Sequence, residues 1–328
     1  MSPGSASAEA PAGRDRPRAG YLGPEGTFSE EALLASAEPG SVEPVASATI
    51  YDAIVALRRG EVEFSIVPIE NSLDGSVSVT LDLLADEQGG LQIVGEALLS
   101  VRHSLIAASE VRLEKIDTVI THPQVPGQCE RFLRGELRHA KVLAASSTAE
   151  AVRSVVAGGR GNEAALGTVL AAEIYGGTVL REGVQDRDDN ETRFVWIARV
   201  DRAAGGGGFP TLPLRAGARR GEWKTSLVFW GPGADSPGWL VRCLDEFSRR
   251  GINLTKIESR PKRERMGHYM FFVDLHGRVD DVQVAEALRG LRGICEEARV
   301  LGSYRAGAAP AGGHDGLPPA VHSGASDG

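Results

Sequence analysis

Short apolar runs alternate with amphipathic stretches along the chain from Arg18 to Val200. This alternation is typical of an α/β layer structure, in which short buried strands are covered by helices with one apolar face. The predicted strands are Ala19–Leu22, Phe64–Ile69, Gln92–Leu98, Thr118–Thr121, Lys141–Ala145, Ala164–Gly167 and Arg193–Arg199. The predicted helices begin near Ser29, Thr49, Val125, Thr148 and Thr168.

The pattern changes after a break at Asp201–Trp223, which contains four consecutive glycines and several arginines and predicts a flexible linker. The segments beyond the break follow the order βαββαβ, which predicts a small ferredoxin-like module. Its predicted elements are strand Thr225–Trp230, helix Gly238–Arg250, strands Asn253–Ser259 and His268–Leu275, helix Val282–Arg292 and strand Ala298–Tyr304.

Composition narrows the class of protein. A chain of 328 residues with 42% hydrophobic and 24% charged residues is typical of a soluble globular protein with two ordered domains. The net charge of −8 argues against a nucleic-acid partner, and no apolar run is long enough to span a membrane. Residues 1–17 and 306–328 are predicted to be disordered tails, because they are rich in small and polar residues.

The three cysteines, Cys129, Cys243 and Cys295, are far apart and form no CxxC pair. They indicate a reduced, cytosolic protein without a disulfide framework or a metal site. Three glycines near the start are spaced GxxGxxG, which is not the dinucleotide-binding spacing, and there is no GxSxG motif. We therefore expect no cofactor and no metal.

Four polar clusters each follow an apolar run, namely Gly23–Glu30, Pro68–Ser72, Thr121–Gln124 and Ser146–Thr148. Taken singly, Thr27 and Ser147 are expected helix N-caps, and His122 is a residue that ends a strand. Taken together, they predict one binding crevice, because strand ends of an open α/β sheet converge on a common edge.

A fifth cluster, Asp189–Phe194, is a polar run that ends abruptly in an apolar strand. Thr192 and Arg193 stand at the mouth of that strand. A hydroxyl donor beside a guanidinium suits an anionic substrate that must lose an oxygen, although a β-branched residue and an arginine can also simply begin an edge strand.

Five segments resemble, in their order along the chain, the motifs of prephenate dehydratases. They are Gly23–Phe28, Glu70–Ser72, Thr121–Gln124, Ser146–Thr148 and Thr192–Phe194. The segment Asn253–Pro261 resembles the signature of the ACT-type regulatory domain attached to those enzymes. The resemblance runs from about Arg18 to Arg305. It implies a cytoplasmic lyase that converts prephenate to phenylpyruvate, water and carbon dioxide in L-phenylalanine biosynthesis, without a cofactor.

The resemblance also implies a two-lobed catalytic domain like a periplasmic binding protein, with the site between the lobes. Lobe one is expected at about 18–98 and 188–201, and lobe two at about 99–187. The catalytic domain then covers 18–201, the linker 202–223 and the ACT-type domain 224–305.

In that family, the threonine that matches Thr192 donates a hydrogen bond to the leaving oxygen. Adjacent residues of a regular strand point to opposite faces, so Thr192 and Arg193 cannot both face one ligand. Either a bend precedes Phe194, or Arg193 is an anchor and another group, such as the helix N-terminus at Ser147–Thr148, binds the pyruvyl carboxylate. The residues expected to bind substrate are Thr27, Asn71, Ser72, His122, Gln124, Ser146, Ser147, Thr148, Arg193 and Phe194.

The family binds phenylalanine as a feedback inhibitor between two ACT-type domains, which implies a homodimer or a higher homo-oligomer. Trp239 stands where the family usually has a small residue, so it either fills the pocket or turns outward and lines it, and the identity of the effector stays open. The residues expected to bind the effector are Pro237, Gly238, Trp239, Leu240, Glu258, Ser259, Arg260 and Pro261.

Two other functions compete with this interpretation. A non-catalytic, two-lobed effector-binding protein has no need of a hydroxyl donor at the position of Thr192. A prephenate dehydrogenase needs a dinucleotide fingerprint, which the sequence lacks.

Overall fold

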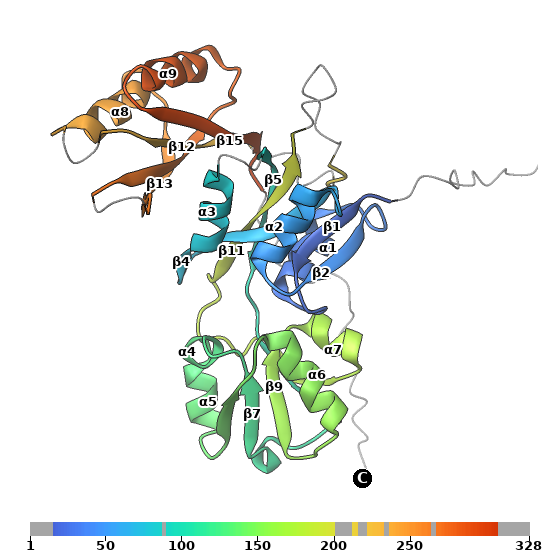
Figure 1. Ribbon diagram of the computed structural model, residues 1–328. Coiled ribbons are helices and arrows are strands. Elements are labelled where there is room, and N and C mark those ends of the chain that lie inside the picture. The colour runs from blue at the N-terminus through green and yellow to red at the C-terminus, as the bar shows by residue number, and fades with distance from the viewer. Residues whose placement is uncertain are drawn as a thin grey trace, which may run out of the picture.

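The computed structural model describes residues 16–86, 90–200, 212–215, 222–232, 236–263 and 267–307. Figure 1 shows three bodies in a row, with the C-terminal module above, lobe one in the middle and lobe two below. The predicted tails lie almost wholly outside the described residues. In the described residues, no helix is both long enough and apolar enough to cross a membrane.

Lobe one is a mixed sheet with the strand order β5-β11-β3-β1-β2, and β4 pairs with β3. Strands β1, β2 and β3 are parallel, whereas β11 is antiparallel to both β3 and β5. Its elements are β1 (Arg18–Leu22), α1 (Phe28–Ser36), β2 (Glu43–Ser47), α2 (Ile50–Arg59), β3 (Phe64–Asn71), β4 (Gly75–Ser76), α3 (Ser78–Ala85), β5 (Leu91–Ser100) and β11 (Glu191–Arg199).

Lobe two is a five-stranded sheet with the order β10-β6-β9-β7-β8. The chain enters it after β5 and returns through β11, so two crossings join the lobes; at the crossing, Val101 N–H donates to Asn190 O over 2.8 Å. Its elements are β6 (Ser104–Ala107), the 3-10 helix Leu113–Lys115, β7 (Thr118–Thr121), α4 (Val125–Gln128), α5 (Glu130–Glu136), β8 (Lys141–Ala144), α6 (Thr148–Gly158), β9 (Glu163–Gly167), α7 (Val169–Tyr175) and β10 (Thr178–Arg181).

The C-terminal module has the predicted βαββαβ order, with the antiparallel strands β13-β14-β12-β15. One face of this sheet packs on α8 and α9, and the other is turned toward lobe one (Figure 1). Its elements are β12 (Trp223–Trp230), α8 (Trp239–Ser248), β13 (Leu254–Pro261), β14 (Tyr269–His276), α9 (Val282–Arg292) and β15 (Glu297–Arg305).

The module and lobe one are joined along a seam. Strand β15 pairs with β5 at Gly302 and Ile93, which merges the two sheets into one ten-stranded sheet. A Cβ at Gly302 would lie 2.2 Å from the carbonyl oxygen of Ile93, so only glycine fits there. Val228, Trp230 and Phe272 of the module belong to the same buried cluster as the apolar face of lobe one. The two domains therefore share a hydrophobic core.

The predicted linker 202–223 falls largely outside the described residues. Its described segment, 212–215, is packed on lobe one, because Leu212 and Leu214 are buried there and Pro213 O accepts from Glu38 N–H over 2.8 Å. This part of the segment is held in place, which differs from the flexible linker that its composition predicts. The following strand begins at Trp223, within the predicted linker.

Candidate functional site

Thr192 and Asn71 are directly opposite each other on the antiparallel strands β11 and β3. The Nδ2 atom of Asn71 donates to Thr192 Oγ1 over 2.9 Å. The Oδ1 atom of Asn71 accepts from the backbone N–H groups of Leu73 and Asp74, each over 2.9 Å, which fixes the orientation of the amide. Because Thr192 Oγ1 accepts from Asn71, the proton of its own hydroxyl is left for another acceptor.

A chain of side-chain hydrogen bonds leads from Asn71 into lobe two. Asn71 Nδ2 also donates to Asn190 Oδ1 over 2.9 Å, and Asn190 Nδ2 donates to Gln128 Oε1 over 3.3 Å. The same Gln128 oxygen lies 2.9 Å from Nε2 of His103. These contacts connect β3 with α4 across the two crossings, so the position of Thr192 is linked to the junction of the lobes.

His103 is buried at this junction, and its ring meets that of Phe28 edge to face at 5.4 Å. Burial lowers the pKa of the imidazole, although the hydrogen bond to Gln128 opposes this effect. The ring is therefore neutral near pH 7. Its Nε2 carries the proton, because the Gln128 oxygen can only accept, and Nδ1 has no hydrogen-bond partner among the described residues.

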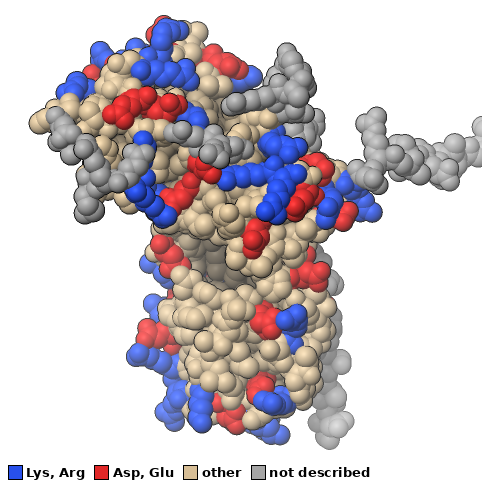
Figure 2. Space-filling view, in the orientation of Figure 1, with Lys and Arg blue, Asp and Glu red and all other residues tan. Residues whose placement is uncertain are grey.

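The lobes also touch where the first glycine turn meets the N-cap and the last residue of α7. Thr168 Oγ1 donates to Gly26 O over 2.6 Å, and Tyr175 OH donates to Glu25 O over 2.8 Å. Gly26 has a φ of +83°, and a Cβ there would lie 2.8 Å from Ala171. Figure 2 shows a hollow between the lobes whose visible walls are largely uncharged.

Thr27 has the N-cap role that the sequence predicts. Its hydroxyl accepts from Glu30 N–H over 3.5 Å and donates to Leu22 O over 2.8 Å. Ser72, in contrast, is exposed at the edge of the Thr192 region, where its Oγ accepts from Glu191 N–H over 3.0 Å. The two hydroxyls are thus engaged by the backbone in this structure.

The predicted lobe-two residues gather at the ends of β7 and β8, which are neighbouring parallel strands. Ser147 caps α6 by accepting a backbone N–H over 3.0 Å, as predicted, while Thr148 is buried and Ser146 is exposed. His122 Nδ1 accepts from the backbone N–H of the exposed Gln124 over 3.4 Å. The common edge expected for these clusters is present within lobe two.

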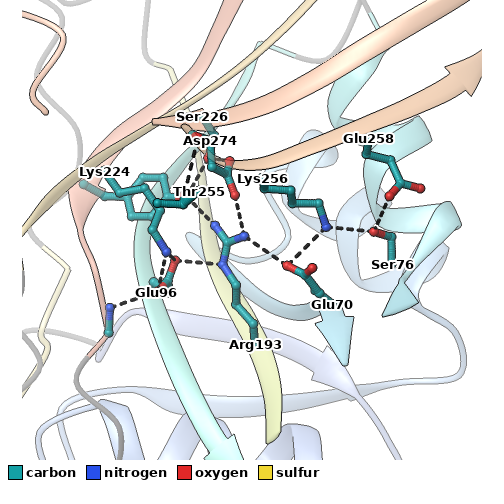
Figure 3. A network of polar contacts seen from close by, with 12 residues as sticks. Glu70, Ser76, Glu96, Arg193, Lys224, Ser226, Thr255, Lys256, Glu258 and Asp274 are labelled. Carbon is teal, nitrogen blue, oxygen red and sulfur yellow. Dashed lines mark hydrogen bonds and ion pairs between the residues drawn. The ribbon is translucent and has the colours of Figure 1, made fainter. Parts of the chain in front are cut away.

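Arg193 points into the contact with the C-terminal module (Figure 3). Its guanidinium donates to Glu96 over 2.8 Å, to Asp274 over 2.5 Å and to Tyr304 OH over 2.8 Å. The side chain is only 9% exposed. Of the two alternatives that the sequence leaves open, this placement favours Arg193 as an anchor and not as a substrate ligand.

The strand is also irregular at this point. The pairing of β11 with β3 slips by one residue at Ile69, between Arg193 and Phe194. Phe194 is buried in the core of lobe one, so its expected contact with substrate is not supported by its position.

A cavity of about 400 Å³ lies at the N-terminus of α8. Gly238 starts this helix with a φ of +75° and caps it without a side chain. The Trp239 indole turns into the core of the module, where its Nε1 donates to Ile294 O over 3.1 Å, so it forms a wall of the cavity without filling it. The lining residues are Ser236, Pro237, Gly238, Trp239, Leu240, Val241, Gly267, Tyr269 and Phe271.

The β13 residues expected to bind the effector divide between two faces. Ser259 and Pro261 pair with Phe271 and Tyr269, which line the cavity, and cross-strand partners share a face.

Glu258 and Arg260 instead meet lobe one. Glu258 accepts from Ser76 Oγ over 2.8 Å, and Arg260 donates to Asp82 over 2.7 Å. They therefore lie apart from the cavity in this chain.

The sequence analysis assigned no role in the site to His103, Gln128, Asn190 or Thr168. For Asn190, the one available sequence signal was its position in the polar run before Thr192. The others become visible only through contacts between the lobes. In the described part of the chain, no group of three or more His, Cys, Asp or Glu residues is placed to hold a metal ion.

Comparisons with known proteins agree with this arrangement. A family model described as prephenate dehydratase matches residues 19–202, and one described as ACT domain matches residues 233–293. The prephenate dehydratase of Mycolicibacterium gilvum is 40% identical over 301 residues, which cover 89% of this chain and 92% of the relative.

Solved structures are similar as well. The prephenate dehydratase of Arthrobacter aurescens in complex with L-Phe is 36% identical with a TM-score of 0.75, over 88% of this chain and 90% of that chain. A chain described as GqqA, a novel type of quorum quenching acylase, is 29% identical with a TM-score of 0.74, over 88% of this chain and 98% of that chain. A family model over more than half of the chain and a relative matched along nearly its whole length show that this chain belongs to the prephenate dehydratase family.

Proposed function

We propose that this lyase converts prephenate to phenylpyruvate, water and carbon dioxide with Thr192 as the donor to the leaving oxygen. Membership in the prephenate dehydratase family supports the reaction. The observation that carries the role of Thr192 is the hydrogen bond that its Oγ1 accepts from Asn71 over 2.9 Å. That bond leaves the hydroxyl proton of Thr192 for the substrate.

The reaction needs little acid–base chemistry from the protein. The bond between the ring and its carboxylate breaks, and that electron pair moves into the ring while the C–O bond at the opposite ring carbon breaks. The oxygen leaves with its electron pair and is protonated to water. Because the product ring is aromatic, the enzyme has mainly to orient the substrate and stabilise the departing oxygen.

Asn71 supplies the orientation of the donor. A free threonine hydroxyl rotates and can donate or accept. Here the amide of Asn71 has a fixed orientation and donates to Thr192 Oγ1, so this oxygen is the acceptor. The same hydrogen bond becomes stronger as negative charge moves onto Thr192 Oγ1 during donation. The pair therefore acts mainly in the transition state, which is where an interaction raises kcat.

The two substrate carboxylates have different needs. The ring carboxylate must lose its charge, so weak contacts with neutral hydroxyls and amides suit it better than an ion pair. For the pyruvyl carboxylate we propose the N-terminus of α6 at Ser147 and Thr148, because backbone N–H groups at a helix start attract anions. Arg193 is already occupied by Glu96 and Asp274, and this leaves the carboxylate role to α6.

The direct test is to mix the purified protein with prephenate and follow phenylpyruvate by its absorbance in base. We expect phenylpyruvate from the wild type, and a rate about 10²–10³-fold lower from Thr192→Ala at the same enzyme concentration. A folded wild type that makes no phenylpyruvate would overturn the proposal, and the acylase described for one similar chain shows that this fold carries other chemistry.

We further propose that an aromatic amino acid, phenylalanine first, binds the cavity at the start of α8. The relative from Arthrobacter aurescens was solved with L-Phe, and this chain has the ACT domain. The cavity is lined by Tyr269 and Phe271 and opens at the helix start near Gly238, which suits an aromatic side chain and a carboxylate. A second copy of the chain would complete this open pocket, so we expect a homodimer or a higher homo-oligomer in the cytoplasm.

Calorimetry with phenylalanine, tyrosine and tryptophan tests the effector site. We expect heat with phenylalanine and its loss in Gly238→Val, because valine introduces a side chain at the helix start and tolerates a positive φ poorly. Absence of heat with all three amino acids would contradict the site, and light scattering would measure the oligomeric state separately.

A further inference from the structure

Arg193 is the centre of a cluster of charged side chains that spans the contact between lobe one and the C-terminal module (Figure 3). Lobe one contributes Arg193, Glu96 and Glu70, and the module contributes the carboxylate of Asp274 and two lysines. Lys224 binds Glu96 over 2.8 Å. The cluster is therefore built from both domains and is incomplete in either one alone.

The central groups are almost fully removed from solvent. The side chains of Arg193, Glu96 and Asp274 are 9%, 2% and 8% exposed. A buried charge is tolerated when its partners satisfy it, and removal of one partner leaves the other charge uncompensated. The planar guanidinium donates in several fixed directions, so its position depends on all of its acceptors at once.

The module also fixes these acceptors. Ser226 Oγ donates to Asp274 over 2.5 Å and lies 2.6 Å from Tyr304 OH. Asp274, Tyr304 and Ser226 stand on the three adjacent strands β14, β15 and β12. A rearrangement of this small sheet therefore changes the site that holds the guanidinium of Arg193.

The lobe-one residues Arg193 and Glu70 of the cluster lie next to the catalytic pair, by which we mean Thr192 and Asn71. Arg193 follows Thr192 in β11, and Glu70 precedes Asn71 in β3. The strands pair Thr192 with Asn71 and Arg193 with Glu70, so the two pairs are consecutive rungs of one ladder. The chain on either side of them is hydrogen bonded, and a displacement of Arg193 moves Thr192 with it.

We propose that Arg193 is a positioning residue, which Asp274 and Tyr304 of the ACT domain hold in place, so that the state of this domain sets the alignment of Thr192 with the substrate. The inference rests on the proposed role of Thr192. It adds to that role a physical connection between the regulatory domain and the catalytic hydroxyl. An effector that favours another arrangement of the module changes turnover through this connection.

A second ion pair between the same domains offers a matched control. Arg260 of the module donates to Asp82 over 2.7 and 3.0 Å, and Asp82 stands on α3. This helix carries neither Thr192 nor Asn71. Asp82→Asn weakens the attachment of the module without touching the rungs beside the catalytic pair.

The experiment compares Tyr304→Phe, Asp274→Asn and Asp82→Asn by steady-state kinetics on prephenate and by thermal melting, without effector. Tyr304→Phe keeps the ring and removes only the hydroxyl that accepts from Arg193, so it preserves packing. For Tyr304→Phe and Asp274→Asn we expect kcat to fall by about 10- to 100-fold, because small misplacements of a catalytic group have effects of this order. We expect KM to change by less than about twofold, and Asp82→Asn to keep the wild-type kcat, since only alignment in the transition state is lost.

The outcomes separate positioning from simple attachment. If all three variants melt lower and keep the wild-type kcat, the cluster only holds the domains together and the inference is wrong. An equal fall of kcat in Asp82→Asn and Tyr304→Phe overturns it as well. Should Asp274→Asn fail to fold, Tyr304→Phe decides alone. A wild type without dehydratase activity would instead show that the proposed function itself fails.

Discussion

Strand β11 presents two different regions on its two sides. Toward the cleft, Thr192 is half-buried and meets the neutral amide of Asn71. Toward the regulatory domain, Arg193 is buried and surrounded by carboxylates. The neutral side leaves the hydroxyl proton of Thr192 available to a ligand, whereas the charged groups around Arg193 are paired with one another within the protein. If the proposed roles of Thr192 and Arg193 hold, one strand carries both the reaction and its control, because neighbouring side chains of a strand face opposite ways.

The contrast also concerns how each region is held. The cleft side depends on single hydrogen bonds between polar side chains, each of which contributes little to folding. The other side combines buried charges with the apolar residues Val228, Trp230 and Phe272, which share a core with lobe one. We therefore expect substitutions on the cleft side to lower the rate with little loss of stability, and substitutions around Arg193 to lower stability as well as the rate.

The largest effect is expected from removing the module. A chain that ends before Trp223 exposes the apolar face of lobe one and leaves Arg193 and Glu96 without their partners in the module. The exposed apolar face loses the stabilisation of about 25 cal/mol per Å² that its burial contributes, and over a domain contact this is large beside typical domain stability. We expect this truncate to aggregate or to lose its cooperative melting transition, as followed by circular dichroism. A truncate that melts within a few degrees of the whole chain would contradict the shared core.

The next effect concerns the hydroxyl on the cleft side. Thr192→Ala should lower kcat by about 10²–10³-fold, because it removes one oriented donor to the leaving oxygen. We expect the melting temperature to stay close to that of the wild type, since the side chain is half-buried and, among the described residues, its hydroxyl is hydrogen bonded to the side chain of Asn71. Thr192→Ser, which keeps a hydroxyl, is the matched control and should retain most of the activity. Equal kcat values for Thr192→Ala and the wild type would make Thr192 a structural residue.

A smaller effect is expected at Asn71. Asn71→Asp keeps an oxygen for the N–H groups of Leu73 and Asp74 but loses the donor to Thr192. Loss of a hydrogen bond of about 1.4 kcal/mol lowers the rate roughly tenfold, and the new carboxylate also draws the Thr192 proton toward itself. We therefore expect kcat to fall by about 10- to 100-fold. A variant with unchanged kcat would mean that Thr192 is oriented by other groups.

The smallest effect is a pH dependence of stability at His103. Burial lowers the pKa of this imidazole below its ordinary value of 6.5 in the folded protein. As the pH falls below 6.5, the unfolded chain binds the proton first, so stability is lost toward acid until the folded pKa is passed. The slope is at most about 1.4 kcal/mol per pH unit for one group. Melting of His103→Gln between pH 7 and 5 should show a shallower decline, and parallel curves would contradict a buried neutral ring.

Much of the fold was predictable, because local signals agreed with tertiary structure. The N-caps at Thr27 and Ser147 mark α1 and α6, and the helix Val282–Arg292 has the predicted bounds. Helix α3 escaped notice because Val77, at its N-cap, makes no side-chain hydrogen bond. Strand β2 is mostly exposed, so its sequence lacks a clear apolar run.

Strands β6 and β10 were also missed. Each has only four residues, which is too short for a clear pattern of apolar and polar positions.

The candidate site was less accessible to sequence reasoning. The motif that contains Thr192 could be recognised, but its pairing with Asn71 joins residues 121 positions apart. The chain through Gln128 to His103 depends on the contact between the lobes, and no local pattern encodes it. The destination of Arg193 depends on Glu96, Asp274 and Tyr304, which are far from it in the sequence and meet it only in the folded protein.

The close approach of Gly302 to Ile93 has a consequence for protein engineering. A regulatory domain transplanted from another enzyme has to present a residue without a side chain where it meets the edge of β5, or the two edges cannot come within bonding distance. It also has to place a carboxylate opposite Arg193. Replacing the C-terminal module of this chain therefore requires a redesign of its contact with lobe one. A domain chosen only for the ligand that it binds would lack the residues that match β5 and Arg193.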